Sequence, residues 1–416
     1  MEKLRGACVI GQSGGPTSVI NASALGAIET ALDEECITKV YGMANGIKGL
    51  LEDRLYDLDQ EDRDELHLLL HTPSSALGSC RYKLADPDKD DTDYKRILEI
   101  FKKYDIRYFF YNGGNDSMDT CNKISKFLLK HGYECRVMGI PKTIDNDLDL
   151  TDHCPGYGSA AKYVATTCME VYRDAAVYGE GSVTVIEVMG RNAGWLTAAS
   201  ALATDQGCGP ELIYLPEVPF DLEKFIRDIK EVLAVRKDVM VAVSEGIKDK
   251  DGVYISSYFT DTEKDKDAFG HIRMGGLAPN LAGYAGARVD ARVRGIELSL
   301  LQRCAAHVGS ENDVNESYSA GKEAVNAAVS GITDKMVGFE RVYNDGVYEC
   351  KTILVDLEKV ANKEKKVPME WINETGNGLL KPFIDYATPL IQGKNEYPTV
   401  NGLPRHANLK YIKPTL

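Results

Sequence analysis

Several features are missing from this sequence, and each absence narrows the range of functions. The chain of 416 residues has no apolar run near the ~20 residues that a membrane-spanning helix needs. It has no excess of positive charge, because 49 Lys and Arg stand against 63 Asp and Glu, for a formal charge of −14. That balance argues against a nucleic-acid partner, which would need a basic face. A single cleft can still bind phosphate, since the global charge says little about one site.

Cysteine motifs and the dinucleotide fingerprint are also missing. The ten cysteines form no C-x-x-C pair and show no spacing typical of a metal site, so we expect buried free thiols. With no signal sequence in view, such thiols predict a cytoplasmic protein. No G-x-G-x-x-G follows the first apolar segment, which disfavours a dehydrogenase of the Rossmann type.

What is present is the composition of a soluble globular protein, with 44% apolar and 27% charged residues and no low-complexity tract. A chain of this length is long for one hydrophobic core, so two domains are expected. Short apolar runs alternate with helical patterns in both halves, although no sequence repeat relates the halves. This alternation predicts an α/β fold built on parallel strands.

The centre of the pattern is the stretch from residue 106 to residue 147. An apolar run at 106–111 leads into the polar residues 113–117 (GGNDS). A helical stripe follows, and a second apolar run at 137–140 leads into residues 141–147 (PKTIDND). A right-handed crossover makes these strands parallel, so both polar clusters lie at carboxyl ends, where open α/β sheets bind ligands. Three acids and a lysine beside two glycines indicate phosphoryl transfer.

Further loops follow predicted strands. Residues 13–18 (SGGPTS) lie between a strand at 7–12 and a helix at 19–32, where glycines and a helix N-terminus can receive an anion. Residues 72–81 form a small-residue loop that ends in Arg81, either a surface cation or a phosphate clamp. Other predicted elements are strands at 183–188, 211–215, 238–243 and 336–342, and helices at 159–178, 221–235, 298–308 and 316–329.

With these loops laid out, the chain resembles the phosphofructokinase superfamily, and within it the pyrophosphate-dependent branch. The resemblance covers residues 7 to 342 and rests on seven motifs in the family's order: SGGPTSVINA, GGNDS, PKTIDND, PGYGSAAKY, EVMGRNAGW, SEG and FGHIRMGG. It implies two interleaved Rossmann-like three-layer αβα domains that face each other. It also implies phosphoryl transfer from pyrophosphate to the 1-hydroxyl of fructose 6-phosphate, with Mg²⁺.

The resemblance assigns expected roles residue by residue. Asp145 matches the family's base for the sugar hydroxyl, and Arg191 matches the arginine that contacts the sugar and the transferring phosphate. The expected donor-binding residues are Gly14, Gly15, Arg81 and Gly114. The expected substrate-binding residues are Thr143, Ile144, Asp145, Asp147, Met189, Gly190, Arg191, Glu245, His271 and Arg303. Plainer interpretations stay open for three of these, since Arg81 could be a surface cation, Arg303 a salt-bridge partner and His271 a hydrogen-bonded loop residue.

Asp116 and Lys142 carry the prediction that pyrophosphate is the donor. ATP-using relatives have glycine at the position of Asp116, which leaves room for the α-phosphate of the nucleotide. A carboxylate there blocks that room and repels the phosphate, whereas pyrophosphate ends before it. Lys142 adds positive charge near the departing phosphate. A plain helix N-cap is the alternative role for Asp116. Asn115 stands where many members have a magnesium-binding aspartate, so either its neutral oxygen serves the metal, as we expect, or another acid takes over.

The predicted division follows the resemblance. It gives a donor-binding domain at 1–155 plus 273–306, a sugar-phosphate domain at 156–272 plus 307–345, and a C-terminal extension at 346–416. A homo-oligomer is expected. Two alternatives remain: an ATP-dependent phosphofructokinase, or a catalytically silent regulatory subunit of such an enzyme.

Overall fold

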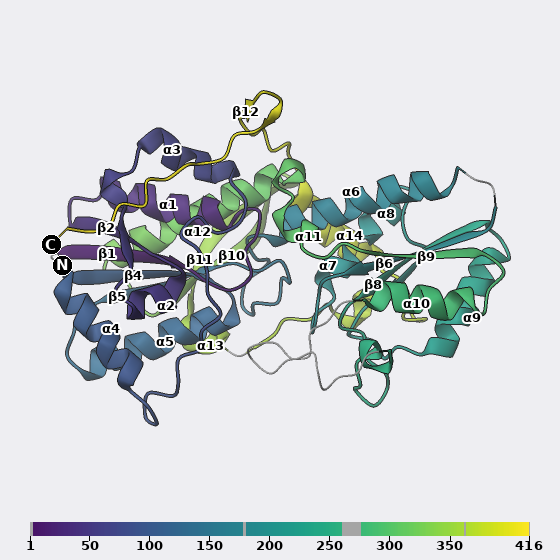
Figure 1. Ribbon diagram of the computed structural model, residues 1–416, viewed down its shortest axis with the longest axis horizontal. Helices are drawn as coiled ribbons and strands as arrows, with labels where there is room; N and C mark the ends of the chain where they lie inside the picture. The colour runs from purple at the N-terminus through teal and green to yellow at the C-terminus, as the bar shows by residue number, and fades with distance from the viewer. Residues whose placement is uncertain (1–2, 178–179, 260–275, 362, 416) are drawn as a thin grey trace.

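The computed structural model describes residues 3–177, 180–259, 276–361 and 363–415. Two β-sheets lie along the long axis of the molecule, each covered by helices on both faces (Figure 1). The first sheet has the strand order β11-β10-β5-β4-β1-β2-β3, and the second has the order β7-β8-β6-β9. The expected α/β class with parallel sheets is confirmed.

The centre of the first sheet consists of largely apolar parallel strands. Strands β1 (Gly6–Gln12), β4 (Ile106–Gly113) and β5 (Arg136–Pro141) are buried along almost their whole length. Strand β4 pairs with both β1 and β5 in parallel, as the crossover argument requires. The outer strands are β2 (Ile37–Met43), β3 (Leu55–Asp57), β10 (Lys335–Asn344) and β11 (Val347–Asp356). Strands β3 and β11 are antiparallel to their neighbours.

Helices from distant parts of the chain cover the two faces of this sheet (Figure 1). Helix α5 (Asn115–Lys130) buries the predicted stripe of Met118, Cys121, Ile124, Phe127 and Leu128. It packs there with α4 (Thr92–Lys103) and α13 (Leu357–Val360). The opposite face carries α1 (Ile20–Asp33) and α12 (Glu311–Val329). These two helices approach closely, because a Cβ on Gly26 would lie 2.0 Å from the carbonyl oxygen of Tyr318.

The second sheet is entirely parallel and is likewise covered on both faces. Its strands are β6 (Ser182–Val188), β7 (Leu212–Tyr214), β8 (Asp238–Ser244) and β9 (Arg292–Glu297). One face packs against α6 (Tyr157–Ala175), α7 (Trp195–Ala198), α8 (Ala201–Asp205) and α14 (Lys381–Ala387). The other packs against α9 (Leu222–Leu233) and α10 (Leu277–Gly286). Shorter helices are α2 (Gly46–Leu51), α3 (Arg63–His67) and α11 (Leu301–Cys304).

Sheet membership corrects the predicted division at two places. Strand β9 pairs with β6, so residues 277–297 belong to the second sheet. The predicted division had wrongly assigned them to the first. Strand β10 pairs with β5, so α12 and β10 belong to the first sheet and not to the second. The crossover through α10 returns the chain to the sheet that it has just left. The local sequence pattern does not indicate which sheet the next strand joins.

Some local predictions also change. The predicted helix at 298–308 is only α11 with a 3₁₀ turn after it. Helix α10 and strands β2, β9 and β11 had not been predicted. The predicted helix at 221–235 is α9, and its N-cap is Asp221, whose side chain accepts from the backbone N–H of Lys224. The thiols are free as expected, with seven of the ten buried.

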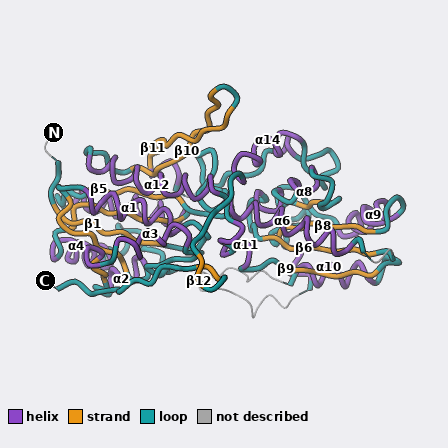
Figure 2. Tube along the Cα trace, turned by 90° about the horizontal axis from the view of Figure 1, so that it is seen from above, coloured by secondary structure: helices purple, strands orange, loops and turns teal. Residues whose placement is uncertain are grey.

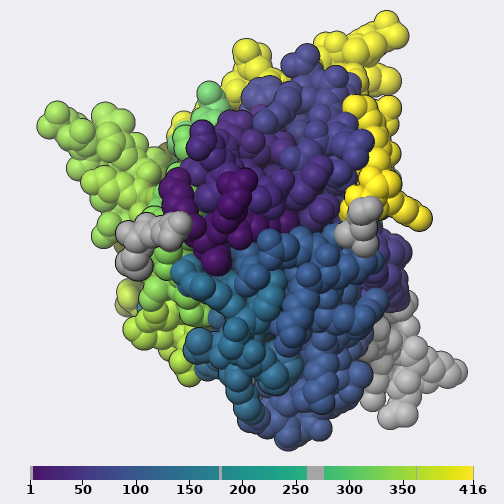
Figure 3. All heavy atoms as spheres, turned by 90° about the vertical axis from the view of Figure 1, so that its left-hand side faces the viewer, coloured from purple at the N-terminus to yellow at the C-terminus, as the bar shows by residue number. Residues whose placement is uncertain are grey.

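The C-terminal segment runs along both halves of the molecule. After α14 it forms the small hairpin of β12 (Thr399–Val400) and β13 (Leu403–Pro404), marked in Figures 1 and 2. It then returns over the first half, where the yellow C-terminal segment lies against the purple and blue N-terminal part of the chain (Figure 3). Glu61 there accepts from the backbone N–H groups of Lys410 and Tyr411, each at 2.8 Å. Every helix of the described residues is too short or too polar to traverse a bilayer.

Candidate active site

Three predicted loops follow adjacent strands of the first sheet and meet at one edge. The backbone N–H of Lys142, after β5, donates to the carbonyl oxygen of Gly113 at the end of β4 at 3.0 Å. The Lys142 ammonium donates to the carbonyl oxygen of Gly15, after β1, at 2.7 Å. Gly14 has a φ of +76°, and a Cβ on it would lie 3.2 Å from Lys142 Nζ. Glycine is therefore what lets the first loop fold around a buried ammonium.

Burial lowers the pKa of Lys142 to about 8, opposed by the nearby carboxylates Asp145 and Asp147. Lys142 is 4% exposed, and its ammonium, beside two loop glycines, provides fixed positive charge where a phosphate chain could lie. It is also poised to lose its proton just above neutral pH.

The acidic loop, residues 142–153, presents two carboxylates whose acidity is reduced. Burial, with the negative charge of Glu245, raises the pKa of Asp145 to about 6. Burial, with the charge of Asp145, raises the pKa of Asp147 to about 7. The Thr143 hydroxyl accepts from the backbone N–H of Asp145 at 3.1 Å, which fixes the turn. A carboxylate with a pKa near 6 is suited to accept a proton at neutral pH.

The second sheet contributes the loops after β6, β8 and β9. Gly190 has a φ of +143°, and its N–H faces a Glu245 carboxylate oxygen at 3.4 Å. A Cβ on Gly190 would lie 2.7 Å from the carbonyl oxygen of Ala193, so the tight turn requires glycine. The N–H of Met189 donates to the side-chain oxygen of Gln302 at 3.1 Å. Arg191 stabilises the charges of Asp145 and Glu245, so the loop after β6 lies beside the acidic loop.

Arg303 lies between the two sets of loops. A Cβ on Gly15 would lie 2.8 Å from a guanidinium nitrogen of Arg303, so this arginine reaches the glycine loop. Its charge also acts on Asp145 and Lys142. Burial and the positive charge of Arg81 lower the pKa of Arg303. Arg81 is exposed but belongs to the same cluster of positive charge.

The first turn of α5 carries the two residues that follow Gly114. The N-cap position is Gly114, so Asp116 is not the N-cap, which removes the plainer interpretation of that residue. The Asp116 side chain is 77% exposed and lies 3.5 Å from the ammonium of Lys83. The side-chain oxygen of Asn115 is buried and accepts no hydrogen bond from the described residues. A buried oxygen without a donor is a suitable ligand for a divalent cation.

The described structure thus brings together most of the predicted residues, from both sheets. Two of them require comment. Ile144 is 7% exposed and its side chain packs into the core under the second sheet, so only its backbone can contact a substrate. His271, in the FGHIRMGG motif, lies outside the described residues.

Sequence reasoning missed the contribution of the C-terminal extension, for which no motif gave a signal. Glu364 accepts from the Asn192 side chain at 2.7 Å and acts on the charge of Asp147. Lys365 donates its backbone N–H to the carbonyl oxygen of Asp147 at 2.8 Å. Lys83 was likewise missed, because a lone lysine in a polar segment has no distinguishing pattern.

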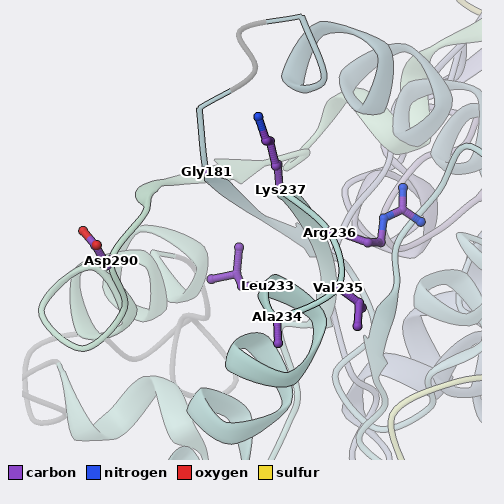
Figure 4. A pocket seen from close by; sticks show the side chains of 7 residues that line it. All are labelled: Gly181, Leu233, Ala234, Val235, Arg236, Lys237 and Asp290. Atoms are coloured by element: carbon purple, nitrogen blue, oxygen red, sulfur yellow. The ribbon is translucent and has the colours of Figure 1, made fainter.

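A shallow surface pocket of about 360 Å³ lies elsewhere, at the beginning of β6 and β8 (Figure 4). It is lined by Gly181, Leu233, Ala234, Val235, Arg236, Lys237 and Asp290. Arg236 is already paired with Glu211 at 3.1 Å. These strand starts are the opposite ends from the loops described above, so this pocket is separate from the cluster of acids and cations.

Comparison with known proteins agrees with this geometry. Residues 7–293 match the family model described as Phosphofructokinase. The chain is 42% identical to the pyrophosphate–fructose 6-phosphate 1-phosphotransferases of Halomonas elongata and Methylococcus capsulatus, over 96% of this chain and 94% of each relative. The crystal structure of a pyrophosphate-dependent phosphofructokinase from Nitrosospira multiformis superposes with a TM-score of 0.89 at 38% identity, covering 99% of this chain and 98% of that one.

Proposed function

Because this chain belongs to the phosphofructokinase family, we propose that it transfers a phosphoryl group from pyrophosphate to the 1-hydroxyl of fructose 6-phosphate. The products are fructose 1,6-bisphosphate and phosphate, and the reaction is reversible. The observation that carries this proposal is the pairing of a partly buried carboxylate with a buried ammonium on one loop. Asp145 is a carboxylate with a raised pKa, and Lys142 is an ammonium held against the glycine loop at Gly15.

The reaction assigned to these groups is an in-line displacement. The 1-hydroxyl oxygen of the sugar gives its proton to Asp145 and forms a bond to the terminal phosphorus of pyrophosphate. The bond between that phosphorus and the bridging oxygen breaks, and phosphate leaves. Lys142 and Arg191 stabilise the negative charge that develops on the transferring and leaving groups. In the reverse direction Asp145 returns the proton.

Binding is divided between the two sheets. The donor occupies the loops of the first sheet, at Gly14, Gly15, Gly114 and Arg81. The sugar phosphate lies toward the second sheet, at Met189, Gly190, Arg191, Glu245 and Arg303, and His271 keeps its predicted role there. Thr143, Asp147 and the Ile144 backbone border the reacting oxygen. Arg303 supports this arrangement, because it reaches both Gly15 and the surroundings of Asp145.

Membership of this phosphotransferase family implies a divalent cation, which we propose to be Mg²⁺. The buried side-chain oxygen of Asn115, which accepts no hydrogen bond from the described residues, fits such an ion. When bound, the cation would neutralise charge on the donor's phosphate oxygens. Asn115 supplies one neutral oxygen, so the donor itself is expected to supply most of the ligands.

The choice of pyrophosphate over ATP rests on Asp116, in the first turn of α5. The resemblance predicts that its carboxylate blocks the path of an α-phosphate, and the relatives at 42% identity are named for pyrophosphate. The direct test compares the two donors with fructose 6-phosphate and Mg²⁺. Pyrophosphate should be used and ATP should be used poorly or not at all. Equal rates would favour the ATP-dependent alternative, and no activity with either donor would favour a regulatory subunit. The expected homo-oligomeric state and cytoplasmic location stay predictions.

A further inference from the structure

A short piece of the C-terminal extension is inserted between the acidic loop and the loop after β6. We define residues 364–367 as the C-terminal strap. On one side, the Lys365 N–H donates to the carbonyl oxygen of Asp147 at 2.8 Å. On the other, the Lys365 carbonyl oxygen accepts from the indole N–H of Trp195 at 2.9 Å, and Val367 N–H donates to Glu217 at 3.1 Å. The strap therefore joins the acidic loop to the second half of the molecule.

The Lys365 side chain adds two further bonds to the same loop. Its ammonium donates to the carbonyl oxygens of Thr151 at 3.0 Å and Asp152 at 2.7 Å. It also lies over the Trp195 ring, 5.1 Å from the ring centroid. Burial lowers the pKa of Lys365, opposed by nearby acids that include Asp147. A buried ammonium that satisfies two loop carbonyls is costly to remove, because both acceptors lose their donor.

The extension holds the same loop at a second point, through Tyr386 of α14. The Tyr386 hydroxyl donates to the carbonyl oxygen of Asp152 at 2.8 Å and accepts from the Asn146 side chain at 2.8 Å. Asn146 lies between the two catalytic-loop acids and has a φ of +54°, a left-handed conformation that few residues adopt readily. Its side-chain oxygen also accepts from the N–H of Cys154 at 2.9 Å. Tyr386 thus stabilises a left-handed turn in the acidic loop.

The far end of the loop is fixed by His153. Its ring nitrogens lie 2.8 Å from an Asp152 oxygen and 2.7 Å from a Glu316 oxygen. The loop is therefore anchored at both ends, and the strap and Tyr386 fix its middle. Phosphoryl transfer depends on exact positioning of the reacting groups, since a displacement of about 1 Å can lower the rate roughly 100-fold.

We propose that Lys365 of the C-terminal strap is a positioning residue for phosphoryl transfer, acting through the backbone of the acidic loop on Asp145 and Asp147. Tyr386 is its partner in this role. The C-terminal extension, which contains no recognisable motif, is thereby part of the active-site architecture. The inference rests on the proposed function, because the rate that it concerns is that of the proposed reaction.

The test compares K365M with K363M in the full chain. Methionine keeps the length of the side chain but donates no hydrogen bond, and the exposed Lys363 is the matched control. For K365M, kcat should fall by about tenfold to 100-fold while both KM values change by less than about threefold. K365R should recover part of the loss in kcat, and K363M should show no loss. A folded K365M with kcat within about twofold of wild type would overturn the proposal.

Two further measurements keep the outcome decisive. If K365M does not fold, Y386F replaces it, with an expected fall of about fivefold or more in kcat at nearly constant KM. An unchanged kcat in Y386F would then overturn the proposal. Hydrogen exchange of residues 142–153 should be faster in K365M than in K363M, and equal exchange would contradict the role. Exchange does not depend on activity, so failure of the proposed function, seen as an inactive wild type, is distinguished from failure of this inference.

Discussion

The ammonium of Lys142 lies 2.7 Å from the backbone carbonyl oxygen of Gly15. This bond joins the loops that follow β5 and β1, with β4 between them in the sheet. The backbone N–H of Lys142 also reaches Gly113 at the end of β4. One residue therefore fixes three loops around the proposed donor site, and it does so with a positive charge whose affinity for its proton is reduced by burial.

The first prediction is a bell-shaped dependence of kcat/KM on pH. Asp145 must be ionised to accept a proton, so activity should rise with pH through about 6, the raised pKa of its carboxyl. Lys142 must be protonated to stabilise phosphate charge, so activity should fall as pH rises through about 8. Because Asp147 interacts with Asp145, the apparent pKa of the acidic limb belongs to the two carboxyl groups together. The variant K142M should be slower with pyrophosphate and should lose the basic limb. Persistence of that limb would exclude Lys142 as its source.

The second prediction concerns the proton acceptor. D145N keeps the shape of the side chain but removes its basicity, so kcat should fall by about 100-fold to 10,000-fold. D149N provides the control, because Asp149 belongs to the same loop and its side chain accepts from the neighbouring N–H of Leu150 at 2.9 Å. Steady-state kinetics with both substrates saturating would measure the effect. A loss of less than about tenfold would rule out general-base catalysis by Asp145.

The third prediction concerns the sugar phosphate. R303M should raise the KM for fructose 6-phosphate more than the KM for pyrophosphate, because Arg303 follows β9 at the edge of the second sheet. Arg294, on β9 itself and 3.7 Å from Asp174, offers a control at a distance from the loops. Equal changes in both KM values for R303M would show that its contact with the glycine loop at Gly15 is the more important one. No change would remove it from the site.

The fourth prediction concerns the metal. Asn115 contributes a neutral oxygen, so calorimetry should detect little Mg²⁺ binding to the free protein and clear binding once pyrophosphate is present. N115D should increase Mg²⁺ affinity in the absence of donor, because it adds a negative charge at that oxygen. Tight binding of Mg²⁺ to the unmodified free protein would require an acidic cage other than Asn115.

These predictions use residues that could be identified from the sequence, and there is a physical reason for that. The loops after β1, β4, β5, β6 and β8 each follow an apolar run and contain glycines, charged residues or both, so the same few positions mark the strand end and supply the reactive groups. Lys142, Asp145 and Gly15 belong to this class. Their convergence follows from parallel pairing alone.

What the sequence could not predict depends on contacts between distant segments. Strand β9 (RVRGIE) is an edge strand with no fully buried residue, so it lacks the apolar pattern that identifies β6. Its assignment to the second sheet follows from pairing with β6, more than 100 positions earlier, and not from its own residues. Lys365 reads as one charge in a lysine-rich linker, yet its ammonium is buried against the carbonyl oxygens of residues 151 and 152. A lysine in a solvated charged linker and a lysine that anchors a buried loop therefore look the same in the sequence.

The last prediction is a change of donor. Asp116 is exposed and 3.5 Å from Lys83, so its charge is partly balanced in the free protein. Against the α-phosphate of ATP, two charges about 4 Å apart would repel by about 1 kcal/mol in water and by more when the nucleotide excludes solvent. D116G removes both the charge and the bulk, so kcat/KM for ATP should rise by roughly tenfold, with the gain measured at fixed Mg²⁺ and fructose 6-phosphate.

D116N separates the two causes, because it removes the charge and keeps the bulk. If repulsion dominates, D116N should give most of the gain that D116G gives, and if bulk dominates it should give little. The pyrophosphate reaction should slow in D116G, since glycine in the first turn of α5 loosens the helix that begins beside the donor loop. K83M tests the ion pair, because freeing the Asp116 carboxylate from its cation should make ATP a still poorer donor. An ATP rate that does not change in D116G would show that another part of the site excludes the nucleotide.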